Sequence, residues 1–412
     1  RFDYPKPRKS DHVDLYHGVK VADPYRWLED PDSSETRAWV EAENKVTFGF
    51  LESIPQREPI KGLLTKLWNY ERYGIPSKEG PRYVFSKNDG LQNQSVLYTL
   101  DRLDGEAALL LDPNTLSKTG TVALAGVVFS EDGSRMAYGL ASAGSDWNVW
   151  KVMDVATRKD LADQLDWMKF SSVSWLKDGS GFYYSRYPEP DPKAKLEALN
   201  YHNKLYFHKL GTPQSEDRLV HEVPDQPQED ALVLERPDQK EWMFAGHVSD
   251  DGRYLIVTIS KGTDDKYRIL YKDLSAAEGR FVELIDNFEF EYTFLDNDGP
   301  VFWFKTNHAA PRGRIIAIDT RKPQAEHWVE LVPQAAETLN SADVVNNQFL
   351  VSYLKDAHTQ VKVFDLKGRL VREIPLPGLG TAVGFDGKRE ETETFFSYTS
   401  YTTPATIYRL DL

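Results

Sequence analysis

The sequence predicts an all-β protein, a seven-bladed β-propeller of four-stranded antiparallel blades that follows a short α-helical N-terminal segment. Three observations lead to this prediction. Helix signals end near residue 70, a two-strand unit then repeats along the rest of the chain, and aromatic residues make up 12% of the sequence. Aromatic and β-branched side chains fit the half-buried surface of a sheet, so their frequency favours strands.

The first 69 residues carry the helix signals. The cluster Asp30-Pro31-Asp32-Ser33-Ser34 is typical of a helix start. Apolar residues at helical spacing follow it, so we expect one helix over about 32–53 and a second over about 56–69, separated near Pro55. We therefore divide the chain into a helical segment, 1–69, and a propeller, 70–412.

The repeat that follows has two halves. The first is an Asp-Gly turn, or a close relative of one, followed by alternating apolar residues, which is a strong signal for a β-hairpin. It occurs at 79–80, 132–133, 178–179, 251–252, 298–299, 346–347 and 386–387. The second half is a strand that ends near an aspartate or a small turn, and it occurs at 97–101, 149–154, 205–211, 268–273, 314–319, 361–365 and 407–411.

Seven copies in 343 residues give a period of 49. A period of about 40–50 residues with four strands per unit is typical of a β-propeller, in which radially stacked sheets bury each other's faces. A large β-sandwich with chance turns is the alternative. The period is broken between Gly179 and Gly252 by two long loops, 186–204 and 212–241. Loops of this length are either functional or tolerated surface insertions.

Composition and motifs exclude several classes of function. The chain has no cysteine, which excludes disulfides, thiol catalysis and Cys-ligated metals, and its net charge of −14 opposes binding to nucleic acid or to an anionic membrane. The nine histidines show no close metal-binding spacing, so we expect no metal and no cofactor. Singly they are most simply surface or packing residues. The G-x-S-x-G motif of α/β-hydrolases is also missing, so the chain shows no complete catalytic constellation.

Several segments resemble the prolyl oligopeptidase family. They begin with His17-Gly18 and the run VADPYRWLEDP at 21–31, continue through GLQNQ at 90–94, LDPN at 111–114 and GSDW at 144–147, and reach SDDGRY at 249–254 and FKTN at 304–307. The resemblance implies a serine peptidase that cleaves short peptides after proline. It also implies that the helical segment packs on a C-terminal α/β-hydrolase domain, which carries the catalytic triad and would begin where this sequence stops.

The resemblance also implies roles for individual residues. Phe170 and Met243 match residues that line a substrate pocket, and the loop 186–204 matches a flexible loop that gates substrate access. Where some family members have an arginine that binds the substrate backbone, this chain has Ser260 beside Lys261. The full set of expected site residues is Phe170 and Met243 for substrate, Arg186, Tyr187, His202 and Asn203 in the gating loop, and Asp146 and Trp147 at the domain interface.

The expected partners are short proline-containing peptides and the intramolecular hydrolase domain, in a cytoplasmic monomer; a periplasmic or secreted protein is the alternative location. The helical segment would then expose an apolar face, with Trp27 and Trp39 as candidate residues. Three other functions remain open at this point. They are a stand-alone propeller that binds a peptide or protein, a propeller enzyme with its own carboxylate site, and a peptide macrocyclase of the same family.

Overall fold

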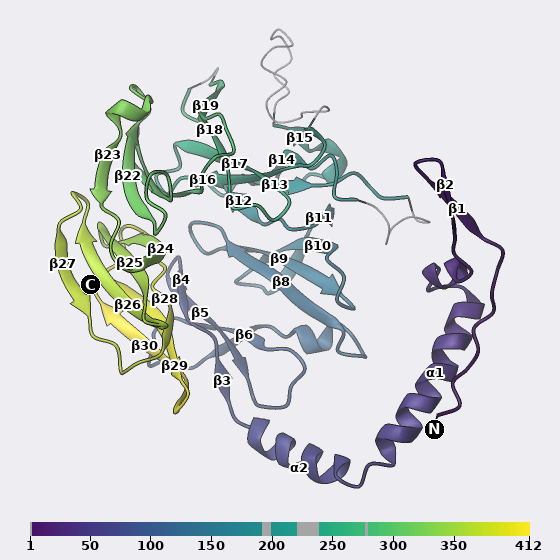
Figure 1. Ribbon diagram of the computed structural model, residues 1–412. Coiled ribbons are helices and arrows are strands. Elements are labelled where there is room, and N and C mark those ends of the chain that lie inside the picture. Colours follow the sequence, from purple (N-terminus) through teal and green to yellow (C-terminus); the bar gives the residue numbers. More distant parts are fainter. Residues whose placement is uncertain (1, 192–198, 221–238, 277–278) are drawn as a thin grey trace. The chain divides into compact units, whose positions relative to one another are not determined.

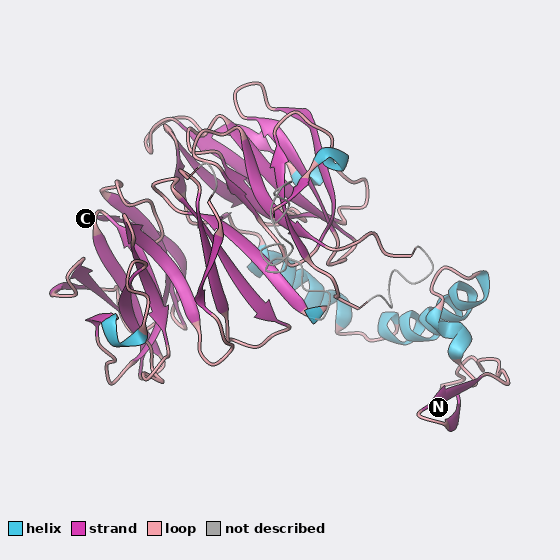
Figure 2. Cartoon of the chain, turned by 90° about the horizontal axis from the view of Figure 1, so that it is seen from above, coloured by secondary structure: helices cyan, strands magenta, loops and turns pink. Residues whose placement is uncertain are grey.

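A computed structural model describes residues 2–191, 199–220, 239–276 and 279–412 of the chain. The chain divides into two compact units, Arg1–Tyr70 and Glu71–Leu412. Figure 2 shows that the second unit consists of strands and loops with a few short helical turns.

The N-terminal unit contains the two predicted helices. Its elements are β1 (Val13–Tyr16), β2 (Val19–Ala22), η1 (Arg26–Glu29), α1 (Ser34–Glu52) and α2 (Arg57–Trp68). Helix α1 begins where expected because the Ser33 hydroxyl accepts a hydrogen bond from the backbone N–H of Thr36 (3.1 Å), which caps the first turn.

The apolar surface of this unit lies elsewhere than expected. Trp27 and Trp39 are half-buried, and Trp27 Nε1 donates to the Arg8 carbonyl (2.8 Å). Helix α2 instead has no buried residue. Its exposed apolar side chains are Ile60, Leu63, Leu64, Leu67 and Trp68. The expected apolar face is present, but its most exposed residues are those that helical spacing puts on one face of α2 rather than the two half-buried tryptophans.

The second unit is a seven-bladed β-propeller (Figure 1). Blade 1 contains β3 (Arg72–Tyr73), β4 (Ser77–Glu79), β5 (Arg82–Asn88), β6 (Val96–Leu100) and β7 (Ala108–Leu111). Blade 2 contains β8 (Val122–Phe129), β9 (Arg135–Ser142), β10 (Asn148–Asp154) and β11 (Lys159–Met168), and blade 3 contains β12 (Val173–Trp175), β13 (Gly181–Arg186), β14 (Lys204–Lys209) and β15 (Arg218–Leu219).

Blades 4 to 7 continue this order around the ring. Blade 4 contains β16 (Trp242–Val248), β17 (Tyr254–Lys261), β18 (Arg268–Asp273) and β19 (Phe281–Ile285), and blade 5 contains β20 (Tyr292–Asp298), β21 (Val301–Thr306), β22 (Arg314–Asp319) and β23 (Val329–Val332). Blade 6 contains β24 (Thr338–Val345), β25 (Gln348–Lys355), β26 (His358–Asp365) and β27 (Leu370–Ile374). Blade 7 has three strands, β28 (Thr381–Gly384), β29 (Glu393–Ser400) and β30 (Thr403–Asp411).

The predicted repeat corresponds to the two central strands of blades 1 to 6 and to the last two strands of blade 7. The strands that follow the Asp-Gly turns are β5, β9, β13, β17, β21, β25 and β29, and the second halves are β6, β10, β14, β18, β22, β26 and β30. The turns adopt the expected geometry, since Gly133 has φ 67° and the pair Asn346-Asn347 has φ 50° and 53°. These left-handed values are what a tight hairpin requires.

The seventh turn differs from the other six. Gly387 is not in the left-handed region, and eight residues, 385–392, connect β28 to β29. This longer connection extends Lys388 and Arg389 toward the other blades. Lys388 Nζ lies 2.7 Å from Glu131 Oε2, at the first turn of blade 2, and the Arg389 guanidinium donates to the Asn297 carbonyl (2.7 Å) and to Asn347 Oδ1 (2.8 Å). Blade 7 is therefore tied to blades 2, 5 and 6.

The core is divided among the seams between blades. Six buried apolar clusters each join two consecutive blades, from the 1–2 seam to the 6–7 seam. In the 2–3 cluster the Trp150 ring occupies space above two glycines, since a Cβ at Gly139 would lie 2.6 Å from Trp150 Cε2 and one at Gly126 would lie 2.9 Å from Trp150 Cη2. Stacked sheets thus bury each other's faces as predicted.

The seam between blade 7 and blade 1 is built differently. The strands of blade 1 come only from residues 72–111 and those of blade 7 only from 381–411, so no strand is shared across the seam. The Tyr83 hydroxyl donates to Glu393 Oε1 (2.5 Å), and the Tyr83 and Phe395 rings meet edge to face at 6.0 Å. A cavity of about 260 Å³ lies beside these contacts. Polar contacts therefore close the ring where the other seams have apolar clusters among the described residues.

Candidate functional site

The two ends of the propeller are distinguished by strand order. Because the strands of a blade are antiparallel, the turns between first and second strands lie at one end, and the links between blades lie at the other. The first turns of blades 1 and 2 touch, since a Cβ at Gly80 would lie 2.3 Å from the Asp132 carbonyl oxygen. We call the two ends the turn end and the link end. The expected substrate and gating residues belong to segments of the link end.

A cavity of about 500 Å³ opens among the blade 2, 3 and 4 segments of the link end. It contains two of the predicted site residues, Phe170 and Asp146. Its other lining residues are small or polar: Ala125, Ser145, Asn148, Ser171, Ser172, Ser185, Ala245 and Gly246. Ser171 Oγ accepts from the backbone N–H of Ser185 (3.1 Å), which fixes the link after β11 against β13. The cavity can therefore accept a small polar or apolar group beside an exposed aromatic ring.

Phe170 is held in an unusual conformation. Its side chain is 61% exposed and its φ is 52°, a left-handed value that costs a non-glycine residue of the order of 1–3 kcal/mol. Lys169 Nζ lies 5.3 Å from the centre of the Phe170 ring and 5.1 Å from that of Trp147. An exposed aromatic residue in a strained link is available for contact with a ligand.

The structure brings Trp147 and Tyr187 together. The Trp147 ring meets the Trp167 ring edge to face at 5.9 Å and the Tyr187 ring at 6.1 Å. The backbone N–H of Tyr187 donates to the Trp167 carbonyl (3.1 Å), and burial raises the pKa of Tyr187 to about 12. An aromatic cluster therefore joins the start of the predicted gating loop to the blade 2 segments beside the cavity.

The other gating residues contact different neighbours. The Arg186 guanidinium lies over the Tyr206 ring (4.5 Å). The backbone N–H of His202 donates to the Lys240 carbonyl (2.8 Å), and buried Asn203 Oδ1 accepts from the backbone N–H of Phe244 (2.9 Å). These contacts hold the second end of the loop against blade 4. Residues 192–198, the middle of the loop, lie outside the described residues, as do residues 221–238 of the second long loop.

Met243 is on β16, half-buried and paired with Ser260 of β17. It does not line the cavity that contains Phe170 and Asp146. Lys261 Nζ lies over the Phe288 ring (4.6 Å), so this cation is also near an aromatic surface of blade 4. The predicted substrate residues Phe170 and Met243 thus occupy separate positions in the propeller.

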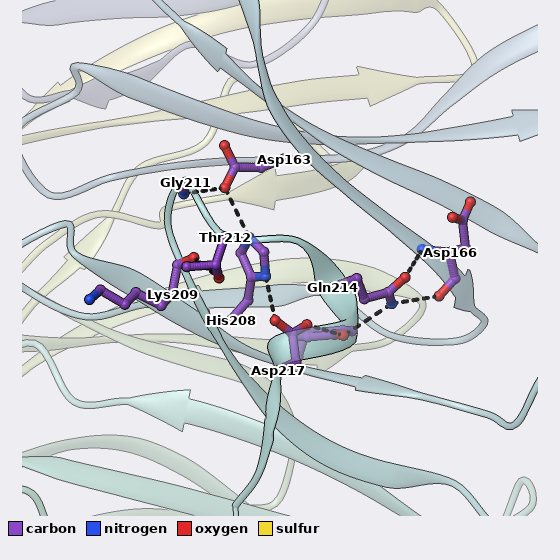
Figure 3. A network of polar contacts seen from close by, with 9 residues as sticks. Asp163, Asp166, His208, Lys209, Gly211, Thr212, Gln214 and Asp217 are labelled. Carbon is purple, nitrogen blue, oxygen red and sulfur yellow. Dashed lines mark hydrogen bonds and ion pairs between the residues drawn. The ribbon is translucent and has the colours of Figure 1, made fainter.

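Two charged groups of residues were not predicted from the sequence. One is a buried imidazole, His208, between Asp163 and Asp217 (Figure 3). The other is a group of carboxylates near the turn end, beside the long seventh connection: Asp250, Asp296, Asp343 and Asp386. Neither has a local sequence signal, because their members come from different blades. In the part of the chain that the structure describes, no three His, Asp or Glu side chains form a group that could hold a metal ion.

Among the described residues, no helix has the length and apolar character needed to cross a membrane.

Comparisons with known proteins agree with this architecture. Residues 4–229 and 225–412 match the family described as "Prolyl oligopeptidase, N-terminal beta-propeller domain". The prolyl endopeptidase of Elizabethkingia meningoseptica is 39% identical over 409 residues, which are 99% of this chain and 56% of that protein. The prolyl endopeptidase of Dictyostelium discoideum is 30% identical, over all of this chain and 61% of that protein.

Solved structures give the same result. A chain from a structural and mechanistic study of two prolyl endopeptidases superimposes with a TM-score of 0.87 at 31% identity, over 99% of this chain and 58% of that one. Prolyl oligopeptidase B from Galerina marginata, bound to a 35-residue hydrolysis and macrocyclization substrate, gives a TM-score of 0.85 at 26% identity, with the same coverage. The chain spans little more than half the length of these relatives. It belongs to the prolyl oligopeptidase family and corresponds to that family's N-terminal β-propeller domain.

Proposed function

We propose that this chain is the gating and substrate-access part of a serine-type prolyl endopeptidase, which cleaves short peptides after proline. The observation that carries the proposal is the link-end cavity, which Phe170 and Asp146 both line in a propeller of this family. The apolar Phe170 ring would contact an apolar side chain of the peptide, and burial of such a group stabilises binding by about 1–3 kcal/mol.

The N-terminal unit supports the same proposal. Helix α2 exposes five apolar side chains, and a groove of about 450 Å³ between the end of α1 and α2 is lined by Leu51, Ile54, Arg57, Ile60, Lys61, Leu64 and Thr65. An exposed apolar surface of this kind favours a protein partner. We propose that the partner is a hydrolase domain of the same polypeptide, since this chain matches only 56–58% of the length of the relatives.

The chemistry would belong to that hydrolase domain. This chain has no G-x-S-x-G motif, so we expect it to bind and gate but not to hydrolyse. The test is to compare the product of the complete gene with the 412-residue chain, using a chromogenic Gly-Pro peptide and intact mass to identify each species. Turnover by the complete product alone, abolished by a serine-reactive inhibitor, supports the proposal. Turnover by the pure 47.1 kDa chain refutes it, because it requires a catalytic site in the propeller.

Hydrolysis is favoured over macrocyclization by sequence similarity. The Galerina marginata relative named a dual function macrocyclase-peptidase is 27% identical to this chain, against 39% for the Elizabethkingia meningoseptica prolyl endopeptidase. The masses of the products from a peptide of 25–35 residues distinguish the two reactions. A linear product confirms hydrolysis, and a product lighter by one water identifies a cyclase.

A further inference from the structure

A fully buried histidine joins blade 2 to blade 3 (Figure 3). His208, on β14 of blade 3, has a side chain with no exposed surface. Its Nδ1 lies 2.7 Å from Asp217 Oδ1 and its Nε2 lies 3.0 Å from Asp163 Oδ1, and both carboxylates are also buried. A carboxylate faces each ring nitrogen, so the geometry suits a ring that donates from both nitrogens, which is the imidazolium form. The triad therefore favours a buried cation between two carboxyl groups.

The surroundings favour this charged form. Burial alone would lower the pKa of His208, but the hydrogen bonds and charges of Asp217 and Asp163 outweigh it, and the pKa is raised. The other polar neighbours of the triad are the Tyr184 hydroxyl, which donates to Asp217 Oδ2 (2.6 Å), and the Gly211 N–H, which donates to Asp163 Oδ1 (2.5 Å). Loss of the proton would leave one carboxylate without its charged donor in a buried site, which is costly.

A chain of hydrogen bonds leads from the triad to the backbone of β11. Tyr184 Oη, which donates to Asp217, accepts from Gln214 Nε2 (3.1 Å). The Gln214 amide in turn binds both backbone groups of Asp166, donating to its carbonyl (3.1 Å) and accepting from its N–H (3.0 Å). Blade 3 therefore holds β11 at two points three residues apart, at the Asp163 side chain and at the Asp166 backbone.

The second point lies immediately before the link that carries Phe170. Trp167 and Phe170 both have left-handed φ values, 63° and 52°. Such conformations persist in non-glycine residues only where neighbouring contacts hold them. The Trp167 carbonyl accepts a hydrogen bond from the backbone N–H of Tyr187. Phe170 comes two residues after Met168, the last residue of β11, and lines the cavity. The Gln214 clamp fixes the point from which this strained segment starts.

We infer that the Asp163–His208–Asp217 triad, acting through Tyr184 and Gln214, positions the segment 166–170 and with it the Phe170 ring. His208 is thus a positioning residue, remote from any ligand. The inference deepens the proposed function, since Phe170 is the proposed peptide contact, but it concerns a local conformation that can be measured without a peptide.

The absence of cysteine from the chain makes a direct test possible. A single cysteine introduced as Phe170→Cys can carry a nitroxide spin label, whose spectrum reports the mobility of the link. The test adds Gln214→Ala, which removes the clamp on Asp166 and leaves the triad intact. We expect the mobile component of the spectrum to increase several-fold, with the thermal midpoint of the propeller little changed.

Two matched controls isolate this effect. Lys159→Ala removes an exposed side chain at the start of the same strand, and we expect no change at the Phe170→Cys label. A label at Leu379→Cys, 77% exposed in the link between blades 6 and 7, has no such clamp in its surroundings and should not respond to Gln214→Ala. Equal spectra with and without Gln214→Ala would overturn the inference, as would an equal response of the Leu379→Cys label.

The triad itself is tested by His208→Asn, which can still donate to one carboxylate but carries no charge. We expect the Phe170→Cys label to become mobile, as with Gln214→Ala, and an immobile label in folded His208→Asn would contradict a positioning role. If His208→Asn does not fold, the spectrum of the Phe170→Cys label with Gln214→Ala decides whether the inference holds. Because no peptide is used, failure of the peptidase assay and failure of this inference are separate results.

Discussion

Carboxylates from several blades face one another near the turn end, and one of them allows a sharp test. Asp343 is on β24, half-buried, and burial together with the charge of Asp386 raises its pKa to about 7, with Asp250 and Asp296 adding to the effect. Burial also raises the pKa of Asp296 to about 6. The Asp343 side chain therefore favours its neutral form when the propeller is folded.

The sign of the effect on stability follows from this shift. The folded pKa is higher than the unfolded one, so the contribution of Asp343 to stability is fully present below about pH 4 and is lost as the pH rises through about 7. A rise from 3.8 to about 7 corresponds to an upper limit of about 4 kcal/mol at about 1.4 kcal/mol per pKa unit. Relaxation of water and side chains around the charge reduces this, so we expect about 1–3 kcal/mol.

The perturbation is Asp343→Asn, which removes the charge and keeps the oxygen that accepts from the Val344 N–H (2.8 Å). We expect the variant to be more stable than the parent by about 1–3 kcal/mol at about pH 8.5 and by roughly a third of that at about pH 5, because the loss begins at the unfolded pKa and is complete only at the folded one. A gain of about 2 kcal/mol raises Tm by about 3 °C for a unit of this size, at an unfolding entropy of about 2.1 cal/mol/K per residue. Thermal unfolding followed by circular dichroism measures this directly.

Asp319→Asn is the matched control. Hydrogen bonds from Arg321 lower the pKa of Asp319 to about 2, so this carboxylate is ionised at both pH values and its removal should not stabilise the protein at either. The reasoning is refuted if Asp343→Asn is destabilised at about pH 8.5, or if its gain is the same at about pH 5.

Three further substitutions test how the ring is held together. Arg389→Ala removes the guanidinium that joins blade 7 to blades 5 and 6, and we expect a loss of about 2 kcal/mol in urea unfolding; an unchanged midpoint would show that the contact contributes nothing. Gly139→Ala places a methyl group 2.6 Å from Trp150 Cε2, so we expect overpacking to lower the free energy of unfolding by about 1–3 kcal/mol, with a red shift in tryptophan fluorescence. An unchanged free energy of unfolding would mean that the Trp150 ring can move aside. Tyr83→Phe removes the hydrogen bond to Glu393 across the 7–1 seam and should cost about 1–2 kcal/mol while hydrogen exchange in β29 speeds up; unchanged exchange would contradict this role.

The sequence predicted the central strands of each blade more clearly than the outer ones. Strands such as β17 and β21 are packed between neighbours, so they are runs of buried apolar and aromatic residues that stand out after an Asp-Gly turn. The edge strands are short or half-exposed, as in β3 and β15 with two residues each. A strand of two residues has no periodicity to detect, so its place in the fold is set by its neighbours.

The local sequence predicted only part of the candidate site. Phe170 and Asp146 were identified from a resemblance, and their meeting in one cavity depends on blades 2, 3 and 4 being adjacent. The triad had no signal at all. His208, Asp163 and Asp217 are separated by 45 and 9 residues, and a lone histidine in a strand is most simply a packing residue. Only the stacking of blade 3 on blade 2 brings the three side chains together.

The way the ring is closed connects these observations. Six seams are stabilised by apolar clusters, whose contribution depends little on pH. The 7–1 seam instead combines the Tyr83–Phe395 ring pair, the Tyr83–Glu393 hydrogen bond and a cavity. The long connection of blade 7 offsets the missing apolar cluster, because Lys388 and Arg389 contact blades 2, 5 and 6. These contacts lie near carboxylates with raised pKa values, such as Asp343. Closure of the propeller at the 7–1 seam therefore depends on charged and polar contacts, in the place where the other six seams have an apolar cluster. A change of pH or of one of these charged residues should therefore act on the 7–1 seam, and local opening there need not disturb the apolar clusters.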